Sequence, residues 1–217
     1  MNELGGRLFK KCSNKLASSF QTLSETTMNL HSLDLPPDLE LLTPRLRVCA
    51  AREDDGSEVN AAVCASWHDL RLWMPWAKTL PSLAESQMSA RGAAWKWQHR
   101  NELDFTIRLR SNGQVVGKCG LHTIEPNIER AEIGYWLDSR FTGYGLMSEA
   151  VARVVIFGDE VGFQRLEIRC DDRNTRSQNV ARRAGFEREG CLRRFAFDNQ
   201  GKWSDLQIWA RLRDTRG

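Results

Sequence analysis

The clearest chemical feature of the sequence is a glycine loop placed between a predicted strand and a predicted helix. Glycine lets the backbone turn tightly and approach a ligand closely, and the unpaired N–H groups of a helix's first turn attract an anion. A pyrophosphate group would suit this loop, although a tight turn without a ligand explains it equally well. The loop is neither the dinucleotide fingerprint nor a P-loop, because the third glycine and the Gly-Lys-Ser/Thr run are absent. Its residues are Arg140, Phe141, Thr142, Gly143, Tyr144 and Gly145.

The cysteines are the other residues with distinctive chemistry. They are spread irregularly, without a Cys-x-x-Cys pair or a nearby histidine cluster, so the sequence predicts neither a disulfide scaffold nor a metal site. Cys119 and Cys170 lie in strand-like runs, which favours small buried hydrophobic roles. The six are Cys12, Cys49, Cys64, Cys119, Cys170 and Cys191.

The composition sets limits on the class of protein. The chain has 217 residues, 41% of them hydrophobic, which is enough for a real core. Its net charge of +3 is too small to indicate nucleic-acid binding. No apolar run approaches the roughly 20 residues needed to cross a bilayer, and no secretory signal is evident. We therefore expect a cytoplasmic protein that does not span a membrane. Arginine is abundant between positions 165 and 194, which would suit a phosphorylated ligand nearby.

Residues 1–38 differ from the rest and are predicted to be an extension of a domain at 39–217. Apolar residues repeat there at helical spacing beside lysines and an arginine. A poorly ordered tail and a short amphipathic helix that binds a partner or a membrane surface are both consistent with this pattern. Met28 is an alternative natural start.

From residue 39 onward, short alternating runs and helical runs take turns, which predicts an α/β or α+β domain. Helices are expected from about residue 54 to 66, 83 to 99, 144 to 161 and 175 to 184. Strands are expected at 46–49, 105–109, 115–121, 131–137, 166–170, 188–197 and 203–212. The last two strands form a hairpin around the turn at 198–201.

Three spaced blocks of sequence carry a resemblance to a known family. They are residues 132–137 (EIGYWL), the loop Arg140-x-x-Gly143-x-Gly145, and Asn174-x-x-Ser177 followed by VARRAGF at 180–186. Together they resemble the GCN5-related N-acetyltransferase (GNAT) superfamily. The opening LTPRL at 42–46 is similar to the RimJ/RimL branch, the ribosomal-protein N-terminal acetyltransferases. The resemblance covers residues 40 to 212.

The resemblance implies a mixed sheet of about seven strands flanked by four helices, with a parallel strand pair that splays apart. It implies that acetyl-CoA is the co-substrate, that its pantetheine arm lies in the split beside the strand 131–137, and that the loop at 140–145 holds its pyrophosphate. Asn174 matches the family residue that contacts the pantetheine arm. A strand N–H near Leu137 is expected to polarise the thioester carbonyl.

The acceptor amine must lose a proton before it attacks the thioester. Glu132 is the candidate base, since a partly buried carboxylate has a raised pKa; its alternative is a solvated glutamate at a strand end. Glu132 shares a strand face with Gly134, whose missing side chain is expected to leave room for the acetyl group. His122 and Glu125 are reserve candidates that the sequence does not rank.

The departing thiolate benefits from a proton. The resemblance implies that Ser177 donates it, although serine at that place also commonly helps to cap a helix. Trp73 and Trp76 lie in a loop that overhangs the acceptor site in this family, and serve as packing or as a clamp for the acceptor. The expected acceptor is a protein N-terminal amine. A small amine such as a drug, polyamine or toxin, and a catalytically idle acyl-CoA-binding module, are the alternatives. Ribosome association and a homodimer stay open.

Overall fold

The computed structural model describes residues 28–30 and 33–213. The predictions for residues 1–27 lie outside the described residues. Just after them, Leu30 is buried in the main hydrophobic core, and Leu33 and Leu35 pack against it. Arg100 donates a hydrogen bond to the Leu35 carbonyl at 2.8 Å. The described residues before position 39 therefore lie against the body of the domain.

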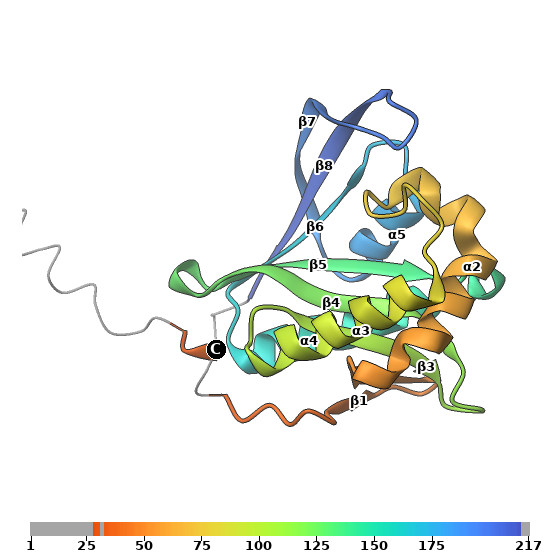
Figure 1. Cartoon of the computed structure of the whole chain (residues 1–217). Coiled ribbons are helices and arrows are strands. Elements are labelled where there is room, and N and C mark those ends of the chain that lie inside the picture. The colour runs from red at the N-terminus through yellow and green to blue at the C-terminus, as the bar shows by residue number, and fades with distance from the viewer. Residues whose placement is uncertain (1–27, 31–32, 214–217) are drawn as a thin grey trace, which may run out of the picture.

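The fold is built on one mixed sheet of eight strands in the order β1-β2-β3-β4-β5-β6-β8-β7 (Figure 1). The sequence predicts about seven strands, and the extra strand is β1, whose three residues are too few to show an alternating pattern. The strands are β1 (Glu40–Leu42), β2 (Leu46–Ala50), β3 (Leu103–Leu109), β4 (Val115–Glu125), β5 (Arg130–Leu137), β6 (Arg165–Asp171), β7 (Glu187–Phe197) and β8 (Trp203–Leu212).

Four helices cover the sheet within the described residues: α2 (Gly56–Trp73), α3 (Leu83–Gln98), α4 (Leu146–Val161) and α5 (Thr175–Arg183). In Figure 1, α2 and α3 lie in front of the sheet and α4 lies behind it. Side chains of β3 alternate accordingly: the Thr106 hydroxyl donates to Asp55 just before α2 at 2.6 Å, while Phe105 stacks edge-on against Phe157 of α4. None of the described helices is long and apolar enough to span a bilayer.

Helix α2 is longer than its sequence pattern predicts. It continues past Ser66 to Trp73, because Leu70 is buried in a cluster with Val115 of β4 and Trp136 of β5. Ser66 bonds to Asp138 and Ser139 just after β5. Asp55 directly precedes the helix, but its carboxylate bonds to Thr106 and Arg108 and makes no hydrogen bond that caps the first turn. Helix α3 begins at a complete capping box formed by Ser82 and Glu85.

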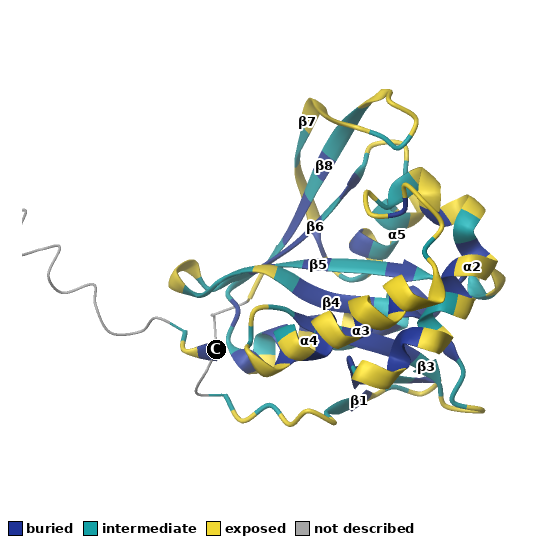
Figure 2. Ribbon diagram, in the orientation of Figure 1, coloured by how far each residue is buried: buried dark blue, intermediate teal, exposed yellow. Residues whose placement is uncertain are grey.

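Burial divides the molecule into a packed body and an exposed hairpin (Figure 2). The strands β2 to β6 and helix α4 carry most of the main core, whereas β7 is exposed or half-buried along its whole length. Cys119 and Cys170 are buried, as predicted. Burial raises the pKa of the Cys170 thiol to about 11, so this thiol stays protonated at neutral pH.

Candidate active site

The parallel strands β5 and β6 separate and open a cleft in the middle of the sheet. They pair only from Arg130↔Arg165 to Glu132↔Glu167, and beyond these pairs the two ribbons diverge (Figure 1). The cleft has a volume of about 1090 Å³. Functional candidates that line it include His122, Glu132, Gly134, Arg169, Asn174 and Ser177.

The edge of β5 along this opening presents backbone N–H groups. Asp138 donates its N–H to the Val116 carbonyl of β4 at 2.7 Å. Successive N–H groups of a strand point to opposite sides, so the N–H of Leu137 points toward the side on which β6 has diverged. An extended chain such as a pantetheine arm fits this edge as an added strand would.

The glycine loop follows β5 and leads into α4, as the sequence predicts. Gly143 and Gly145 have φ angles of +87° and +76°, which side-chain-bearing residues rarely adopt. A Cβ at position 143 would meet nothing within 4 Å, so the backbone conformation, not a lack of space, requires glycine there. The N–H groups of Phe141 and Thr142 bond to the Asp138 and Ser139 carbonyls, and the first bond of α4 runs from the Glu149 N–H to the Gly145 carbonyl. The N–H groups from Gly143 to the first turn of α4 are therefore placed to bind an anion.

The side chains of this loop do not reach into the cleft, since none of the described residues that line the cleft belongs to positions 140–145. Phe141 packs against the main core, and the Thr142 hydroxyl donates to the Ser139 carbonyl at 2.8 Å. Tyr144 is exposed. The loop is therefore suited to hold a pyrophosphate through its backbone at one end of the cleft.

A buried carboxylate that the sequence did not single out fixes the start of this loop. Asp138 is 0% exposed and accepts hydrogen bonds from the Arg140 backbone N–H at 3.0 Å and from the Arg140 guanidinium at 2.6 Å. The Ser66 hydroxyl of α2 donates to Asp138 and accepts from the Ser139 N–H at 2.8 Å. Arg140 is thus held by Asp138, and its guanidinium is engaged with that carboxylate.

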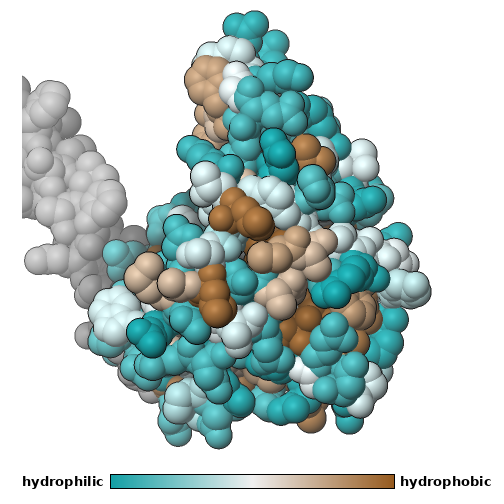
Figure 3. Space-filling view, turned by 45° about the vertical axis from the view of Figure 1, so that its right-hand side comes forward, coloured by the Kyte–Doolittle hydropathy of each residue, from teal (hydrophilic) through white to brown (hydrophobic). Residues whose placement is uncertain are grey.

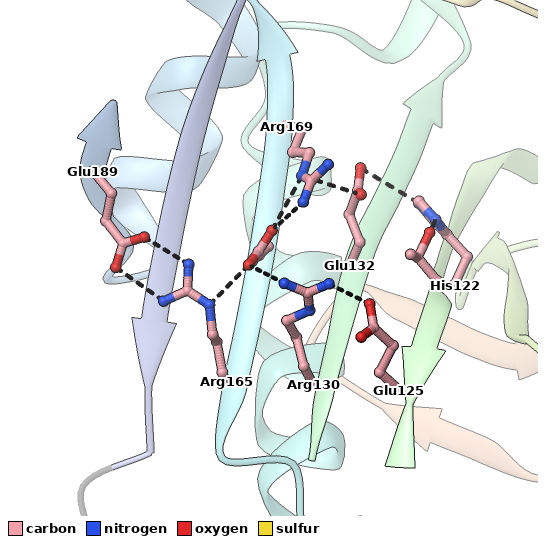
Figure 4. Close-up of polar contacts among 9 residues, drawn as sticks. His122, Glu125, Arg130, Glu132, Arg165, Arg169 and Glu189 are labelled. Atoms are coloured by element: carbon pink, nitrogen blue, oxygen red, sulfur yellow. Dashed lines mark hydrogen bonds and ion pairs between the residues drawn. The ribbon is translucent and has the colours of Figure 1, made fainter. Parts of the chain in front are cut away.

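Glu132 lies at the point where β5 and β6 part (Figure 4). Burial raises the pKa of Glu132, and Glu167 raises it further by a smaller amount. His122, Arg169 and Arg130 lower this pKa, but they do not outweigh burial. Arg169 approaches it to 3.5 Å. A half-buried carboxylate with a raised pKa that lines the cleft has the properties of a general base.

On the neighbouring strand β6, the register partner of Glu132 is a second glutamate, Glu167. It anchors a group of arginines that includes Arg165 and Arg169 (Figure 4). Glu167 is 3% exposed and accepts hydrogen bonds from Arg165 at 2.8 Å and from Arg169 at 2.9 Å. Burial raises the pKa of Glu167, but these two arginines outweigh it and hold the pKa below its usual value. Glu167 is therefore ionised and structural, and it fixes Arg169 beside Glu132.

The reserve candidates occupy different places. His122 lines the cleft, and its Nε2 lies 4.0 Å from a Glu132 carboxylate oxygen. Glu125 is paired with Arg130 and is absent from the described cleft lining. The space beside Gly134, which the sequence suggested for the acetyl group, is filled by the imidazole of His122: a Cβ on Gly134 would lie 2.6 Å from its Nε2.

Ser177 faces the cleft from the first turn of α5, but it is not the helix cap. That role belongs to Asn174, whose side-chain oxygen accepts the Ser177 N–H at 3.1 Å. The Ser177 hydroxyl instead lies 2.8 Å from the hydroxyl of Tyr135 on β5. Burial raises the pKa of Tyr135, so its phenol is neutral and available as a donor. The sequence missed Tyr135, because the strand and the helix meet only in the folded chain.

Aromatic side chains line the other side of the cleft. Trp73 is the last residue of α2, not part of the loop as predicted, and Trp76 follows in the loop. Trp76 is 50% exposed and packs edge-on against Trp136 at 6.3 Å between ring centroids. Asn199 in the β7–β8 turn donates to the carbonyls of Arg71 and Met74. The hairpin and the loop after α2 are therefore joined across the cleft, and Figure 3 shows hydrophobic side chains gathered between hairpin and body.

The splayed sheet, the glycine loop and the cleft together define an acetyl-CoA-dependent acyltransferase. A family model described as the acetyltransferase (GNAT) domain matches residues 45–187, and the chain belongs to this family. It is an N-acetyltransferase that uses acetyl-CoA. Among the described residues, no group of three or more His, Cys, Asp or Glu side chains is placed to hold a metal ion.

Relatives of known structure and sequence point to one branch of this family. The chain is 28% identical over 172 residues to the ribosomal-protein-serine acetyltransferase of Escherichia coli K12, covering 79% of this chain and 94% of that protein. It is also similar to RimL, a ribosomal L7/L12 α-N-protein acetyltransferase solved with coenzyme A, with 27% identity, a TM-score of 0.77 and coverage of 81% and 99%. A Salmonella typhimurium enzyme described as modifying the N-terminal serine of L7/L12 has 26% identity, a TM-score of 0.73 and coverage of 81% and 100%.

Proposed function

We propose that the protein acetylates the N-terminal α-amine of a ribosomal protein that begins with a small residue. The observation that carries this proposal is Glu132, a half-buried carboxylate with a raised pKa at the point where β5 and β6 diverge. Similarity to acetyltransferases named for ribosomal proteins supports the choice of acceptor. This role would place the protein in the cytoplasm, in at least transient contact with the ribosome.

Each residue of the cleft has a separate role in the proposed reaction. The N–H groups at positions 143–146 hold the pyrophosphate, and Asn174 contacts the pantetheine arm. The N–H of Leu137 donates to the thioester carbonyl and stabilises the negative charge that develops there. Glu132 takes a proton from the acceptor ammonium, and the free amine attacks the carbonyl carbon directly. Ser177, supported by Tyr135, donates a proton to the departing thiolate.

No covalent intermediate with the protein is required, since both substrates meet in one cleft. Positioning of the amine against the thioester then supplies much of the rate enhancement. Trp73 and Trp76 contact the acceptor, because they line the cleft beside its opening and Trp76 leaves half of its surface free. A flat aromatic surface suits the backbone of an extended peptide as well as a small apolar amine.

An acceptor panel tests this proposal. Purified protein is incubated with acetyl-CoA and peptides that begin with Ser, Ala or Met, with the same peptides blocked at the α-amine but carrying an internal lysine, and with polyamines and aminoglycosides. Thiol release and product mass are measured. We expect acetylation at the α-amine of the Ser- or Ala-first peptides. Preferential acetylation of the small amines would replace the proposed acceptor, and binding of acetyl-CoA without any transfer would indicate an idle binding module.

A further inference from the structure

His122 and Glu132 are direct neighbours across two antiparallel strands. Their Cα atoms are register partners between β4 and β5, so both side chains leave the same face of the sheet. Nε2 of His122 lies 4.0 Å from Oε1 of Glu132, and Figure 4 shows the ring turned toward the carboxylate. The His122 side chain is 37% exposed against 19% for Glu132. The imidazole is therefore the more exposed member of the pair.

The backbone next to His122 adopts a strained conformation. Thr123 has a φ of +48°, which is unusual for a β-branched residue, and the pairing register shifts between His122 and Glu125. Strain of this kind persists only where the surrounding structure enforces it. The Thr123 hydroxyl lies 3.1 Å from Nδ1 of His122. This contact engages Nδ1 and leaves Nε2 facing Glu132.

The missing side chain of Gly134 leaves the space that the His122 ring occupies. A Cβ at this position would lie 2.6 Å from Nε2 and 2.9 Å from Cδ2 of His122, far inside van der Waals contact. Gly134 lies within β5 and lacks the positive φ that would itself require glycine. The lack of a side chain at position 134 is therefore explained by the imidazole that occupies the space.

The charges around this pair are otherwise fixed. Glu132 lies 3.5 Å from Arg169 and also interacts electrostatically with Glu167 and Arg130. Glu167 is hydrogen-bonded to Arg165 and Arg169. Arg130 is paired with Glu125. Further along the cleft, Lys118 and Asp104 pair with each other. Among the described groups beside Glu132, His122 supplies an imidazole, a side chain that can both accept and donate a proton in acid–base chemistry.

We propose that His122 relays the proton that Glu132 takes from the acceptor, so that the two residues act as one proton-transfer pair seated by Gly134. The inference rests on the proposed role of Glu132. The ammonium N–H bond breaks and an O–H bond forms on Glu132. This O–H bond then breaks as an N–H bond forms at Nε2 of His122, and the imidazolium releases the proton to water. Each turnover returns both groups to their starting state, and His122 acts through Glu132 as a positioning and relay residue.

A double-mutant cycle tests the relay. Acetyl transfer to a Ser-first peptide is measured for His122→Ala, Gly134→Ala, the double variant and Glu132→Gln. We expect His122→Ala to lower kcat by roughly 10- to 100-fold, at or below the usual range for a lost acid–base group, with little change in either KM. Gly134→Ala should give a similar loss alone and less than about a twofold loss in the His122→Ala background, because the ring it displaces is already gone. Added imidazole should restore part of the His122→Ala rate.

Gly190→Ala is the matched control, because Gly190 lies in β7 and an added Cβ there meets nothing within 4 Å. If Gly134→Ala lowers kcat equally in the wild-type and His122→Ala backgrounds and raises the KM for acetyl-CoA, the inference is overturned. The space at Gly134 would then be assigned to the acetyl group. A wild-type kcat for His122→Ala beside an impaired Glu132→Gln would overturn the relay alone. A wild-type kcat for Glu132→Gln would remove the proposed base and the relay with it.

Discussion

Asp138→Asn is expected to loosen the glycine loop, because this buried carboxylate joins α2 to the start of the loop. It accepts both the backbone N–H and the guanidinium of Arg140, together with the Ser66 hydroxyl. An asparagine keeps one acceptor oxygen but turns an NH₂ group toward these donors. Breaking a buried ion pair costs about 3–5 kcal/mol. Arg140 is 55% exposed and can be rehydrated, so we expect a smaller loss of about 2–3 kcal/mol.

For a chain of this size, such a loss lowers Tm by roughly 4–12 °C, at about 2–4 °C for each kcal/mol. Affinity for coenzyme A should fall as well, because the N–H groups that we propose to bind the pyrophosphate depend on the loop's geometry. Hydrogen bonds from Arg140 and Ser66 outweigh burial and hold the pKa of Asp138 below its usual 3.8. The stabilisation is therefore present above that pH and is lost as the pH falls through the lowered pKa.

Thermal melts from pH 7 to pH 3 and calorimetric titration with coenzyme A measure these effects. The difference in Tm between wild type and Asp138→Asn should be full at pH 7 and shrink below about pH 3.8. Ser66→Ala is the matched variant, since it removes one neutral partner of the same carboxylate and should cost about 1 kcal/mol. Equal melting temperatures and equal affinities for coenzyme A in wild type and Asp138→Asn would refute this reasoning.

Three further changes test other parts of the site. Gly143→Val should weaken coenzyme A binding. Its control is Gly113→Val, which imposes the same positive-φ strain in a turn away from the cleft and should lower Tm but leave the affinity for coenzyme A intact. An affinity of Gly143→Val equal to that of wild type would remove the loop from the binding site. Ser177→Ala should lower kcat by roughly 10²- to 10⁴-fold, as expected when the general acid is lost. Tyr135→Phe should lower kcat by less, and both variants should keep nearly the wild-type affinity for the cofactor. A kcat of Ser177→Ala within about twofold of wild type would assign the general acid to another residue. Glu167→Gln should destabilise the protein at pH 7 and lose its difference from wild type as the pH falls below 4.5; a difference that persists in acid would contradict the lowered pKa.

The sequence predicted the elements whose patterns are local. The alternating run at 166–170 and the helical run at about 175–184 placed β6 and α5 to within one residue at each end. Strand β1 was missed because three residues carry no period, and α2 was predicted too short because its last turns are buried by contacts with distant strands. Local pattern cannot report such contacts.

The same limit applied to the site. The glycine loop could be predicted, since its signal lies in six consecutive residues with a strand before and a helix after. The partnership of Tyr135 with Ser177 could not, because it joins residues 42 positions apart. Gly134 was assigned to the acetyl group, whereas the register between β4 and β5 places His122 there. Asp138 gave no signal of its function, because burial and three-dimensional contacts create it.

The pH dependence of kcat/KM for wild type and Glu132→Gln tests the central claim most directly. Burial raises the pKa of Glu132, and a base acts only when ionised, so wild-type activity should fall in acid along a limb that begins above the ordinary range of a glutamate. In Glu132→Gln this limb should vanish, and the remaining rate should rise with pH as the acceptor amine itself loses its proton. A variant profile with the same shape and height as wild type would contradict the account, because proton removal would then not depend on Glu132.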